Sequence, residues 1–311
     1  MEMKTPRTAL VTGGLGFLGQ AVAHSLRRDG YRVVGLGHGQ RPAEEIRAAG
    51  FDRWVCGDVS LQLLSTLEES FELVVHCASN SAVGYSLAHP HEAFLRTVQS
   101  TADLLEHLRS TQSRALVIYP SSAAVYGAAQ DRPLQESDVP NPVSPYGVHK
   151  LITEELLAGH ARHFSVRVAI VRFFSIYGAG LSKQLLWDAA VKMSSGQKTV
   201  EFWGTGEETR DWIHVQDAAD LIARLACSDA DFFLLNGAAG ERVTVRDVLE
   251  KLRAALGLDI DIRFNSMVRP GDPRFYHADV SRLKTLPWQP RVTLEQGLEN
   301  YANWFKASWS K

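Results

Sequence analysis

Short apolar runs alternate with amphipathic stretches along the first part of the chain. The apolar runs are rich in β-branched residues, and the segments between most of them place apolar residues at helical spacing. This alternation predicts an α/β fold, a doubly wound parallel sheet with helices on both faces. The strands are expected over residues 8–11, 32–36, 53–56, 73–76, 115–119 and 167–173.

The alternation of apolar β-rich runs with amphipathic segments ends after residue 176. Helical patterns are expected at 183–195, 217–227 and 294–305, with a short β-rich run at 199–203 and a Gly-Thr-Gly turn after it. The pattern predicts a first domain over 1–176, joined by part of 211–240. A smaller C-terminal α/β domain over 177–311 is interleaved with it.

Four glycines follow the first expected strand, in the run Thr-Gly-Gly-Leu-Gly-Phe-Leu-Gly. A strand, a glycine turn and a helix in this order are typical of a Rossmann-like dinucleotide site. Gly13 permits a tight turn, Gly16 lets the backbone approach a pyrophosphate, and Gly19 lets the helix pack on the strand. The helix start at Phe17 and Leu18 offers unpaired N–H groups to the phosphates. The position of the cluster favours this interpretation over a simple loop.

Tyr146 and Lys150 lie four residues apart, which places them on one face of a helix. A free phenol titrates near pH 10, and a neighbouring ammonium favours the phenolate. A shift of about three pKa units corresponds to roughly 4 kcal/mol, enough to make Tyr146 a general acid/base. The spacing also occurs in helices that merely carry a solvated lysine, so the remaining motifs decide between the two interpretations.

Composition narrows the class of protein. The 311 residues carry a formal net charge of −2, which gives no reason to expect nucleic acid or an anionic membrane as partner. No apolar run has the length of a membrane span, and the first residues lack the apolar core of a secretory signal. Cys56, Cys77 and Cys227 are widely spaced, as in buried thiols of a reducing compartment. We therefore expect a cytoplasmic protein without a metal site.

Several ordered motifs together resemble the extended short-chain dehydrogenase/reductase family, specifically its NAD-dependent nucleotide-sugar epimerases, dehydratases and reductases. The resemblance covers nearly the whole chain. Any one motif could arise by chance, but their joint order is a strong signal. The motifs occupy residues 12–19, 57–59, 76–78, 121–127, 146–150, 210–211 and 269–272.

The resemblance implies a role for each of these motifs. Tyr146 would be the acid/base, and Lys150 would hold the nicotinamide ribose and lower the pKa of Tyr146. Ser122 would hydrogen-bond the reacting sugar oxygen, although it could instead cap the turn after the fifth strand. Asp58 and Val59 would contact the adenine ring. Further cofactor contacts are expected at His38, Arg41, Cys77, Ala78, Ser79, Ser121, Phe173 and Ser175.

Arginines are expected to grip the diphosphate of a nucleotide sugar, because a guanidinium matches phosphate geometry. Arg210 and Arg269 carry this role in the resemblance, and either could instead be a surface ion-pair partner. The full set of expected substrate contacts is Ser79, Ser81, Ser122, Ala123, Ser175, Arg210, Arg269 and Asp272.

Departures from the family pattern bear on the subtype. Ala123 and Ala124 stand where the dehydratases carry an Asp-Glu pair, which argues against dehydration. Ser175 stands where an asparagine commonly contacts the substrate, and Ser81 stands where 4-epimerases usually have a lysine that contacts the cofactor. The chain therefore resembles the 4-epimerases most, with an unusual substrate in prospect.

The end of the second strand is also atypical. NAD-preferring members place an acidic residue there, whereas this chain has Gly37, followed by His38 and Arg41. Without a carboxylate a 2′-phosphate would not be repelled, and Arg41 could pair with it. Arg41 could equally be a solvated loop residue. The expected cofactor is NAD, with NADP left open.

The sequence therefore predicts a nucleotide-sugar 4-epimerase that uses NAD and acts on a nucleotide-diphosphate sugar. The first alternative is an NADPH-dependent 4-keto-(6-deoxy)-sugar nucleotide reductase. The second is a non-catalytic protein that senses the cofactor, which retention of Ser122, Tyr146 and Lys150 disfavours. A homodimer is expected from the resemblance.

Overall fold

Two units, each built from three segments of the chain, make up the computed structural model, which describes residues 7–79, 82–128, 131–228, 231–267 and 274–309. The first unit comprises Met1–Gly127, Val139–Phe173 and Ala219–Leu235. The second comprises Ala128–Asp138, Phe174–Ala218 and Asn236–Lys311. The domain bounds predicted from the sequence are 1–176 and 177–311, with part of 211–240 in the first domain.

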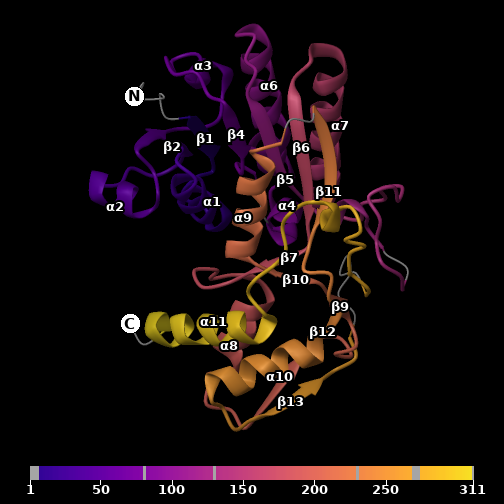
Figure 1. Cartoon of the computed structure of the whole chain (residues 1–311). Coiled ribbons are helices and arrows are strands. Elements are labelled where there is room, and N and C mark those ends of the chain that lie inside the picture. The colour runs from indigo at the N-terminus through magenta and orange to yellow at the C-terminus, as the bar shows by residue number, and fades with distance from the viewer. Residues whose placement is uncertain (1–6, 80–81, 129–130, 229–230, 268–273, 310–311) are drawn as a thin grey trace. The chain divides into compact units, whose positions relative to one another are not determined.

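The first unit is organised around one seven-stranded sheet in the order β11-β6-β5-β4-β1-β2-β3 (Figure 1). The strand order reverses between β1 and β4, which is the arrangement of a Rossmann-like doubly wound sheet. This confirms the predicted fold class. The strands are β1 Thr8–Thr12, β2 Arg32–Gly37, β3 Arg53–Cys56, β4 Leu73–His76, β5 Leu116–Ser122, β6 Arg167–Phe173 and β11 Phe232–Gly237.

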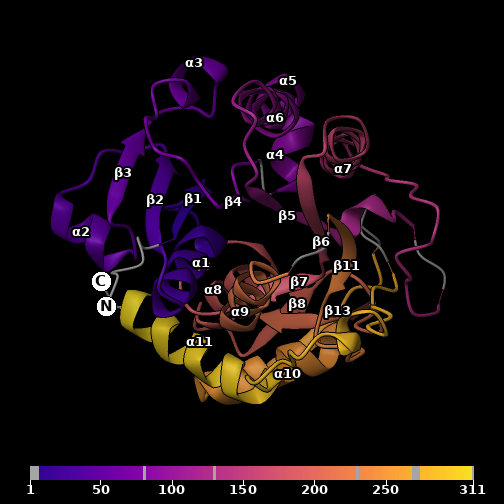
Figure 2. The same cartoon turned by 45° about the horizontal axis from the view of Figure 1, so that its top comes forward.

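Helices cover both faces of this sheet, as Figure 2 shows. One face carries α3, α6 and α7, and the other carries α1 with α9, where Ser25 donates a 2.7 Å hydrogen bond to Asp220. The helices of this part are α1 Phe17–Arg28, α2 Ala43–Ala48, α3 Leu61–Leu64, α4 Val83–Ala88, α5 Pro90–Phe94, the π-helix η1 Leu95–Gln99, α6 Ser100–Ser110, the 3-10 turn η2 Ala123–Val125, α7 Pro145–Phe164 and α9 Val215–Leu225.

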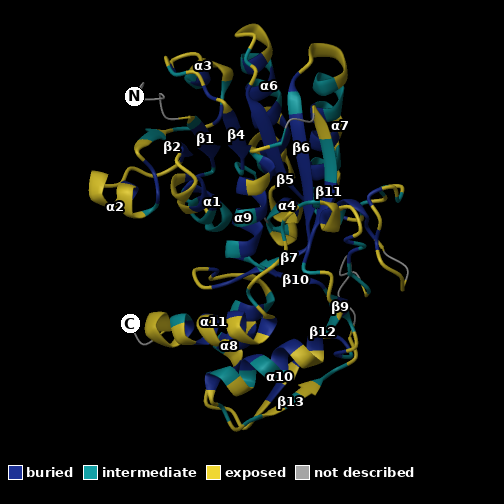
Figure 3. Cartoon of the chain, viewed as in Figure 1, coloured by how far each residue is buried: buried dark blue, intermediate teal, exposed yellow. Residues whose placement is uncertain are grey.

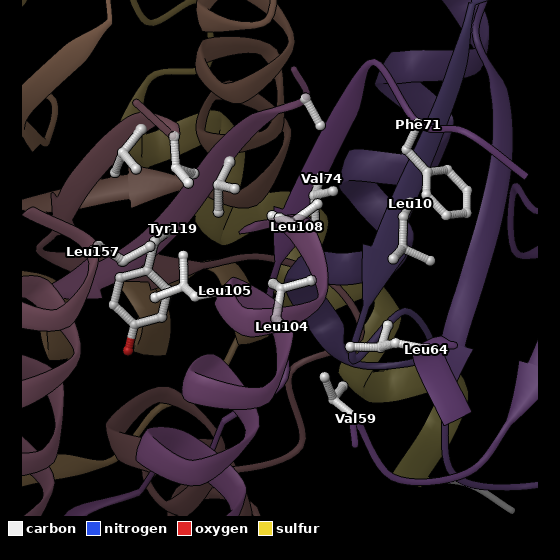
Figure 4. Packing of buried hydrophobic residues seen from close by; sticks show 14 of the residues in the cluster. Leu10, Val59, Leu64, Phe71, Val74, Leu104, Leu105, Leu108, Tyr119 and Leu157 are labelled. Carbon is white, nitrogen blue, oxygen red and sulfur yellow. The ribbon is translucent and has the colours of Figure 1, made fainter. Parts of the chain in front are cut away.

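The core of the first unit lies between the central strands and the helices α3, α6 and α7. Figure 3 shows β4, β5 and β6 buried along most of their length. Leu105 and Leu157 lie beside the ring of Tyr119 in this cluster (Figure 4). Because both faces of these strands are covered, their sequences are almost continuously apolar. Burial of this surface holds the strand ends that carry the predicted site.

The second unit contains three two-stranded sheets, β7–β10, β9–β12 and β8–β13. Helix α10 begins where the Thr244 hydroxyl accepts from the Asp247 amide at 3.0 Å, and it ends at Gly257 with φ of +70°. The elements are β7 Ser175–Tyr177, α8 Gln184–Met193, β8 Thr199–Phe202, β9 Thr209–Arg210, β10 Trp212–His214, β12 Val243–Thr244, α10 Val245–Leu256, β13 Asp261–Phe264, the 3-10 turn η3 Leu283–Thr285 and α11 Leu294–Trp309.

Within the described ranges, no helix has both the length and the apolar character that crossing a bilayer requires.

Candidate active site

Helix α7 carries both residues of the Tyr-x-x-x-Lys motif. It begins at Pro145 because the Ser144 hydroxyl accepts a hydrogen bond from the Gly147 amide at 3.2 Å and because proline favours the first helical position. A Cβ at Gly147 would lie 2.6 Å from the carbonyl oxygen of Ala124, so only glycine lets this turn of α7 approach the end of β5. Tyr146 and Lys150 therefore face the last residues of β5.

Ser122 is the last residue of β5. The sequence analysis expects Ser121 and Ser122 to follow this strand, but pairing with β6 continues as far as the partner of Ser122, Phe173. The Ser122 hydroxyl accepts from the Ala124 amide at 3.2 Å and also hydrogen-bonds Tyr146. The structure thus shows the turn cap that the sequence left as one alternative, and the contact of Ser122 with a sugar oxygen stays a prediction.

Lys150 is buried, with 3% of its surface exposed. Its ammonium donates to the Pro120 carbonyl at 2.8 Å and to the Ser79 hydroxyl at 3.2 Å, and it lies 4.5 Å from the centre of the Tyr119 ring. Burial lowers the pKa of Lys150 to about 8. The ammonium is therefore held by fixed acceptors beneath the strand ends.

The structure differs from the expected tuning of Tyr146. Burial raises the pKa of this phenol, and the hydrogen bond from Ser122 opposes that rise. Lys150 lies 5.9 Å from the centre of the Tyr146 ring, and its ammonium is directed at Pro120 and Ser79. The lowering of the Tyr146 pKa by Lys150 that the resemblance implies is thus not found in this structure.

The glycine turn lies against the loop that follows β4. Gly13 has φ of +62°, and a Cβ there would lie 2.8 Å from the Ala78 nitrogen. The Gly16 amide donates to the Gly13 carbonyl at 2.9 Å, and a Cβ at Gly19 would lie 2.6 Å from the same oxygen. The turn is therefore a backbone cradle in front of α1, which begins at Phe17. This cradle fits the pyrophosphate of a dinucleotide.

A buried hydrogen-bond chain ties this turn to the neighbouring strand and helix. The Ala78 amide donates to Thr12 Oγ1, which lies 2.8 Å from His76 Nδ1. On the other side, His76 Nε2 lies 3.0 Å from Thr101 Oγ1, which donates to the Thr97 carbonyl. Because Thr101 donates its hydroxyl proton to the Thr97 carbonyl, it can only accept a hydrogen bond from His76, so the ring proton of His76 is assigned to Nε2. Burial lowers the pKa of His76 to about 3, so the ring stays neutral.

A second buried network extends the stripe of Tyr146 and Lys150 by one helical turn. The Glu154 carboxylate accepts from the Ser121 hydroxyl at 2.5 Å and from Arg172 Nη2 at 2.7 Å, with Arg172 Nε at 3.1 Å from each of its oxygens. It thereby joins α7 to β5 and β6 next to Ser122. No role was predicted for Glu154 from the sequence. Two signals were available: its four-residue spacing from Lys150 and the presence of Arg172 inside an apolar strand.

The predicted adenosine contacts gather at the ends of β2 and β3. His38 Nε2 lies 2.9 Å from Asp58 Oδ1, and both side chains are largely exposed. Arg41 lies 3.9 Å from Glu45 on α2. Val59 is buried in the core described above. The other predicted cofactor residues in the first unit lie near the glycine turn or the end of β5, namely Leu18, Cys77, Ser79, Ser121 and Phe173.

Two predicted contacts lie in the second unit. Ser175 begins β7, and Arg210 ends β9 with its guanidinium donating to the Thr209 carbonyl at 2.8 Å. The adjacent Asp211 is fully buried and accepts from backbone amides, among them that of Ala239 at 3.0 Å, which fixes the segment that carries Arg210. Ala123, in η2 of the first unit, is buried. Ser81, Arg269 and Asp272 lie outside the described residues.

Two curated relatives match the chain in sequence over almost their whole length. A curated UDP-glucose 4-epimerase from Azospirillum brasilense is 31% identical, covering 99% of this chain and 92% of that protein. A putative UDP-glucose 4-epimerase from Methanocaldococcus jannaschii is 27% identical over 96% of this chain and 98% of that protein.

Solved structures agree with these sequence matches. MoeE5 in complex with UDP-glucose and NAD superposes with a TM-score of 0.84 at 31% identity, covering 97% of this chain and 99% of that one. UDP-glucose 4-epimerase from Bifidobacterium longum with NAD⁺ and UDP gives 0.84 at 27% identity, covering 96% and 98%. The family model described as the NAD dependent epimerase/dehydratase family matches residues 9–231. The chain therefore belongs to the NAD dependent epimerase/dehydratase family.

Proposed function

We propose that this protein is a UDP-sugar 4-epimerase that works with a bound NAD. The observation that carries the proposal is the group formed by Ser122, Tyr146 and Lys150 at the carboxyl edge of the sheet, where the glycine turn also lies. Relatives named as UDP-glucose and UDP-glucuronate 4-epimerases support the reaction and the class of substrate.

NAD, when bound, supplies a hydride acceptor and donor for carbon 4 of the sugar. The cradle of Gly13, Gly16 and Gly19 would hold its pyrophosphate, and Lys150 its nicotinamide ribose. Ser122, already hydrogen-bonded to Tyr146, would orient the C4 oxygen of the sugar toward the phenol.

Tyr146 moves the proton. Its phenol oxygen takes the proton of the C4 hydroxyl as that carbon becomes a carbonyl, and returns it once the 4-keto sugar has turned over. The ammonium of Lys150 favours the phenolate form of Tyr146, which is the form that accepts this proton. Burial raises the pKa of this phenol, so the ammonium of Lys150 would have to offset that rise.

The test is interconversion of UDP-glucose with UDP-galactose, of their N-acetyl analogues, and of UDP-glucuronate with its 4-epimer, each followed by NMR. Tyr146→Phe should lower kcat by about 10²–10⁴-fold and leave NAD binding intact, because only the proton carrier is lost. Tyr31→Phe, a buried tyrosine at the start of β2, is the matched control and should retain activity. Turnover in Tyr146→Phe at the wild-type rate would refute the assigned role.

A second function is favoured by the missing carboxylate after β2. A 4-keto-sugar reductase would use the same residues once, in the reducing direction, with NADPH exchanged in each cycle. Denaturing the purified protein and identifying the released nucleotide distinguishes the two functions. Retained NAD supports the epimerase, whereas an empty protein that oxidises free NADPH only with a 4-keto sugar supports the reductase.

We further propose that Arg210 contributes to binding the diphosphate of the UDP-sugar and that the protein is a cytoplasmic homodimer. Exposed apolar residues on the first unit, Leu95, Val148 and Ile152, support a dimer because a second copy would cover them. The three free thiols are consistent with a reducing compartment, but Cys56 and Cys227 are exposed, so the expectation that these thiols are buried is wrong for both. Ile152→Glu should lower the mass measured by light scattering from dimer to monomer.

A further inference from the structure

Lys150 is buried, yet its hydrogen-bond partners among the described residues are neutral. Its ammonium donates to the Pro120 carbonyl at 2.8 Å and to the Ser79 hydroxyl at 3.2 Å. The Glu154 carboxylate lies one turn further along α7, where it forms its ion pair with Arg172 instead. Because a buried charge without an ion pair is unfavourable, other groups have to stabilise this ammonium.

The ring of Tyr119 supplies a further contact. The Lys150 nitrogen lies over this ring, 4.5 Å from its centre. A cation above an aromatic face is attracted by the negative charge of the π system, and the attraction is stronger where water is excluded. Tyr119 is fully buried in the middle of β5, so water does not screen the contact.

Packing fixes the orientation of the Tyr119 ring. The ring centre lies 6.0 Å from that of His76 on β4, and the two planes are 30° apart. Leu105 of α6 and Leu157 of α7 lie beside the ring in the core (Figure 4). Because the ring is held between a strand and two helices, its face stays directed at Lys150.

The other groups around Lys150 do not change charge near neutral pH. Burial lowers the pKa of His76 to about 3 and raises that of Cys77 to about 12, so both stay neutral. Burial also raises the pKa of Tyr146 and of Tyr119 above that of a free phenol. With a pKa of about 8, Lys150 is the member of this group that titrates just above neutral pH.

The charge of Lys150 has two tasks in the proposed reaction. The ammonium would hold the nicotinamide ribose, and it would favour the phenolate form of Tyr146 against the effect of burial. Both tasks require a protonated Lys150 whose nitrogen stays in place. Because its pKa lies close to neutral pH, a small loss of stabilisation would leave much of the enzyme with a neutral amine.

We infer that Tyr119 is a positioning residue for the proposed epimerase reaction, because the face of its ring holds the ammonium of Lys150 in place and keeps it protonated. The inference rests on the proposed function for the two tasks of Lys150. The contact itself belongs to the protein without substrate, so it can be measured independently of turnover.

The titration of Lys150 tests the contact directly. Protein labelled with ¹³C-lysine is titrated by NMR, and the Cε signal of Lys150 is assigned by its absence in Lys150→Met. Tyr119→Leu removes the aromatic face and should lower the pKa of Lys150 by about one unit, because the charged form loses a favourable contact. Tyr119→Phe keeps the face and should titrate like the wild type.

The pH dependence of kcat/KM reports the same change through the proposed reaction. In the wild type, kcat/KM should fall as the pH rises past about 8, because Lys150 loses its proton. In Tyr119→Leu the fall should begin about one pH unit lower, whereas Tyr119→Phe should follow the wild type.

Tyr31→Leu is the matched control. Tyr31 is also buried, and its ring lies under another cation, with Cζ of Arg7 4.2 Å from the ring centre. Its replacement removes a buried ring of the same size at the start of β2. The titration of Lys150 and the pH at which kcat/KM falls should both stay unchanged.

A second variant covers the case in which Tyr119→Leu does not fold. A ring-fluorinated phenylalanine at position 119 keeps the volume of the ring and withdraws charge from its face, so it should lower the pKa of Lys150 in the same direction. An unchanged Lys150 titration in these variants overturns the inference.

The two measurements also separate the inference from the proposed function. A shifted Lys150 titration with an unshifted kcat/KM profile overturns the role of Tyr119 in the reaction. A shifted titration in a protein that epimerises none of the sugars leaves the contact standing and contradicts the proposed function instead.

Discussion

Two regions at the carboxyl edge of the seven-stranded sheet, the end of β5 and the ends of β2 and β3, differ in how far their polar side chains are buried. At the end of β5, the residues Ser121, Glu154 and Arg172 are 3–4% exposed. Ser121 and Arg172 both donate short hydrogen bonds to the Glu154 carboxylate. At the ends of β2 and β3, the side chains of His38 and Asp58 are 65% and 77% exposed and share a single contact.

The difference follows from what each end has to do. The proposed proton transfer requires Ser122 and Tyr146 to stay within hydrogen-bond distance. A buried carboxylate that joins α7, β5 and β6 restricts all three elements. Cofactor selection depends on charge near the ribose, which exposed side chains can supply or lose at little cost in stability. The residues that we propose for catalysis are thus fixed by a buried network, whereas the predicted adenosine contacts His38 and Asp58 lie on the surface.

The largest effect is expected from Arg172→Ala. Removing this guanidinium leaves the Glu154 carboxylate buried without its cation, which should lower the free energy of unfolding by about 3–5 kcal/mol. Urea denaturation measures the loss. Arg109→Ala is the matched control, because Arg109 forms an equally short two-bond pair with Glu106 on the exposed surface. Similar losses in both variants would remove the contrast between the two ends.

Should Arg172→Ala fail to fold, a double variant keeps the comparison testable. Replacing both partners, as in Glu154→Leu with Arg172→Met, removes the uncompensated charge and should regain most of the stability. Its kcat should stay low, because Ser121 no longer has the acceptor that fixes the end of β5. Full activity in this double variant would show that the network does not position the site.

The next effect is expected from acid, through the buried His76 at the end of β4. The pKa of His76 is about 3 in the folded protein, against about 6.5 in the unfolded chain, so only the unfolded chain takes up a proton as the pH falls below 6.5. The stability contributed by the neutral ring is present above pH 6.5 and is lost as the pH falls toward 3. Between pH 7 and pH 5 this loss amounts to about 2 kcal/mol.

Urea denaturation at these two pH values compares the wild type with His76→Gln. The variant has no imidazole to protonate, so its stability should fall less over the same interval. Equal losses in both proteins would mean that His76 titrates normally in the folded chain.

Ser121→Ala should have a smaller effect on stability than Arg172→Ala and a selective effect on activity. It deletes one hydrogen bond to a charged acceptor, worth about 1.5–3 kcal/mol, without leaving a buried charge unpaired. We expect kcat to fall more than KM rises, because the neighbouring Ser122 loses its fixed position. Ser110→Ala, at the exposed end of α6, should alter neither constant.

The smallest effect on stability is expected at the ends of β2 and β3, where His38 and Asp58 are exposed. His38→Ala should change the free energy of unfolding by less than about 0.5 kcal/mol, since its pair with Asp58 is exposed to water. A thermal melt of the nucleotide-free protein measures it. A loss as large as that of Arg172→Ala would contradict the proposed division between a fixed core and a changeable surface.

Apolar periodicity predicted much of the sheet. The expected bounds of β3, β4 and β6 agree with the structure, and β1 and β2 differ by one residue. The extension of β5 through Ser122 was missed because hydrogen bonding to β6, rather than hydrophobicity, decides where that strand ends. No strand was predicted at β11, whose partner β6 lies far away in sequence.

The candidate site was less accessible to sequence reasoning. The spacing of Tyr146 and Lys150 predicted their shared helical face, but it could not show that Lys150 would be directed at Pro120 and Ser79. The role of Glu154 depends on two side chains from different strands, a convergence that only the folded chain creates. The local pattern of apolar and polar residues predicts secondary-structure elements, whereas pKa values depend on burial and on neighbours that are distant in sequence.

The position of β11 has a consequence for synthesis. This strand pairs with β6 and closes one side of the sheet, yet it comes from the last of the three segments that build the first unit. While the ribosome is still making residues 174–218, the emerging chain holds β6 as a bare hydrogen-bonding edge. Such an edge is open to pairing with other nascent chains, so this stage of translation is where we expect chaperone dependence to be greatest.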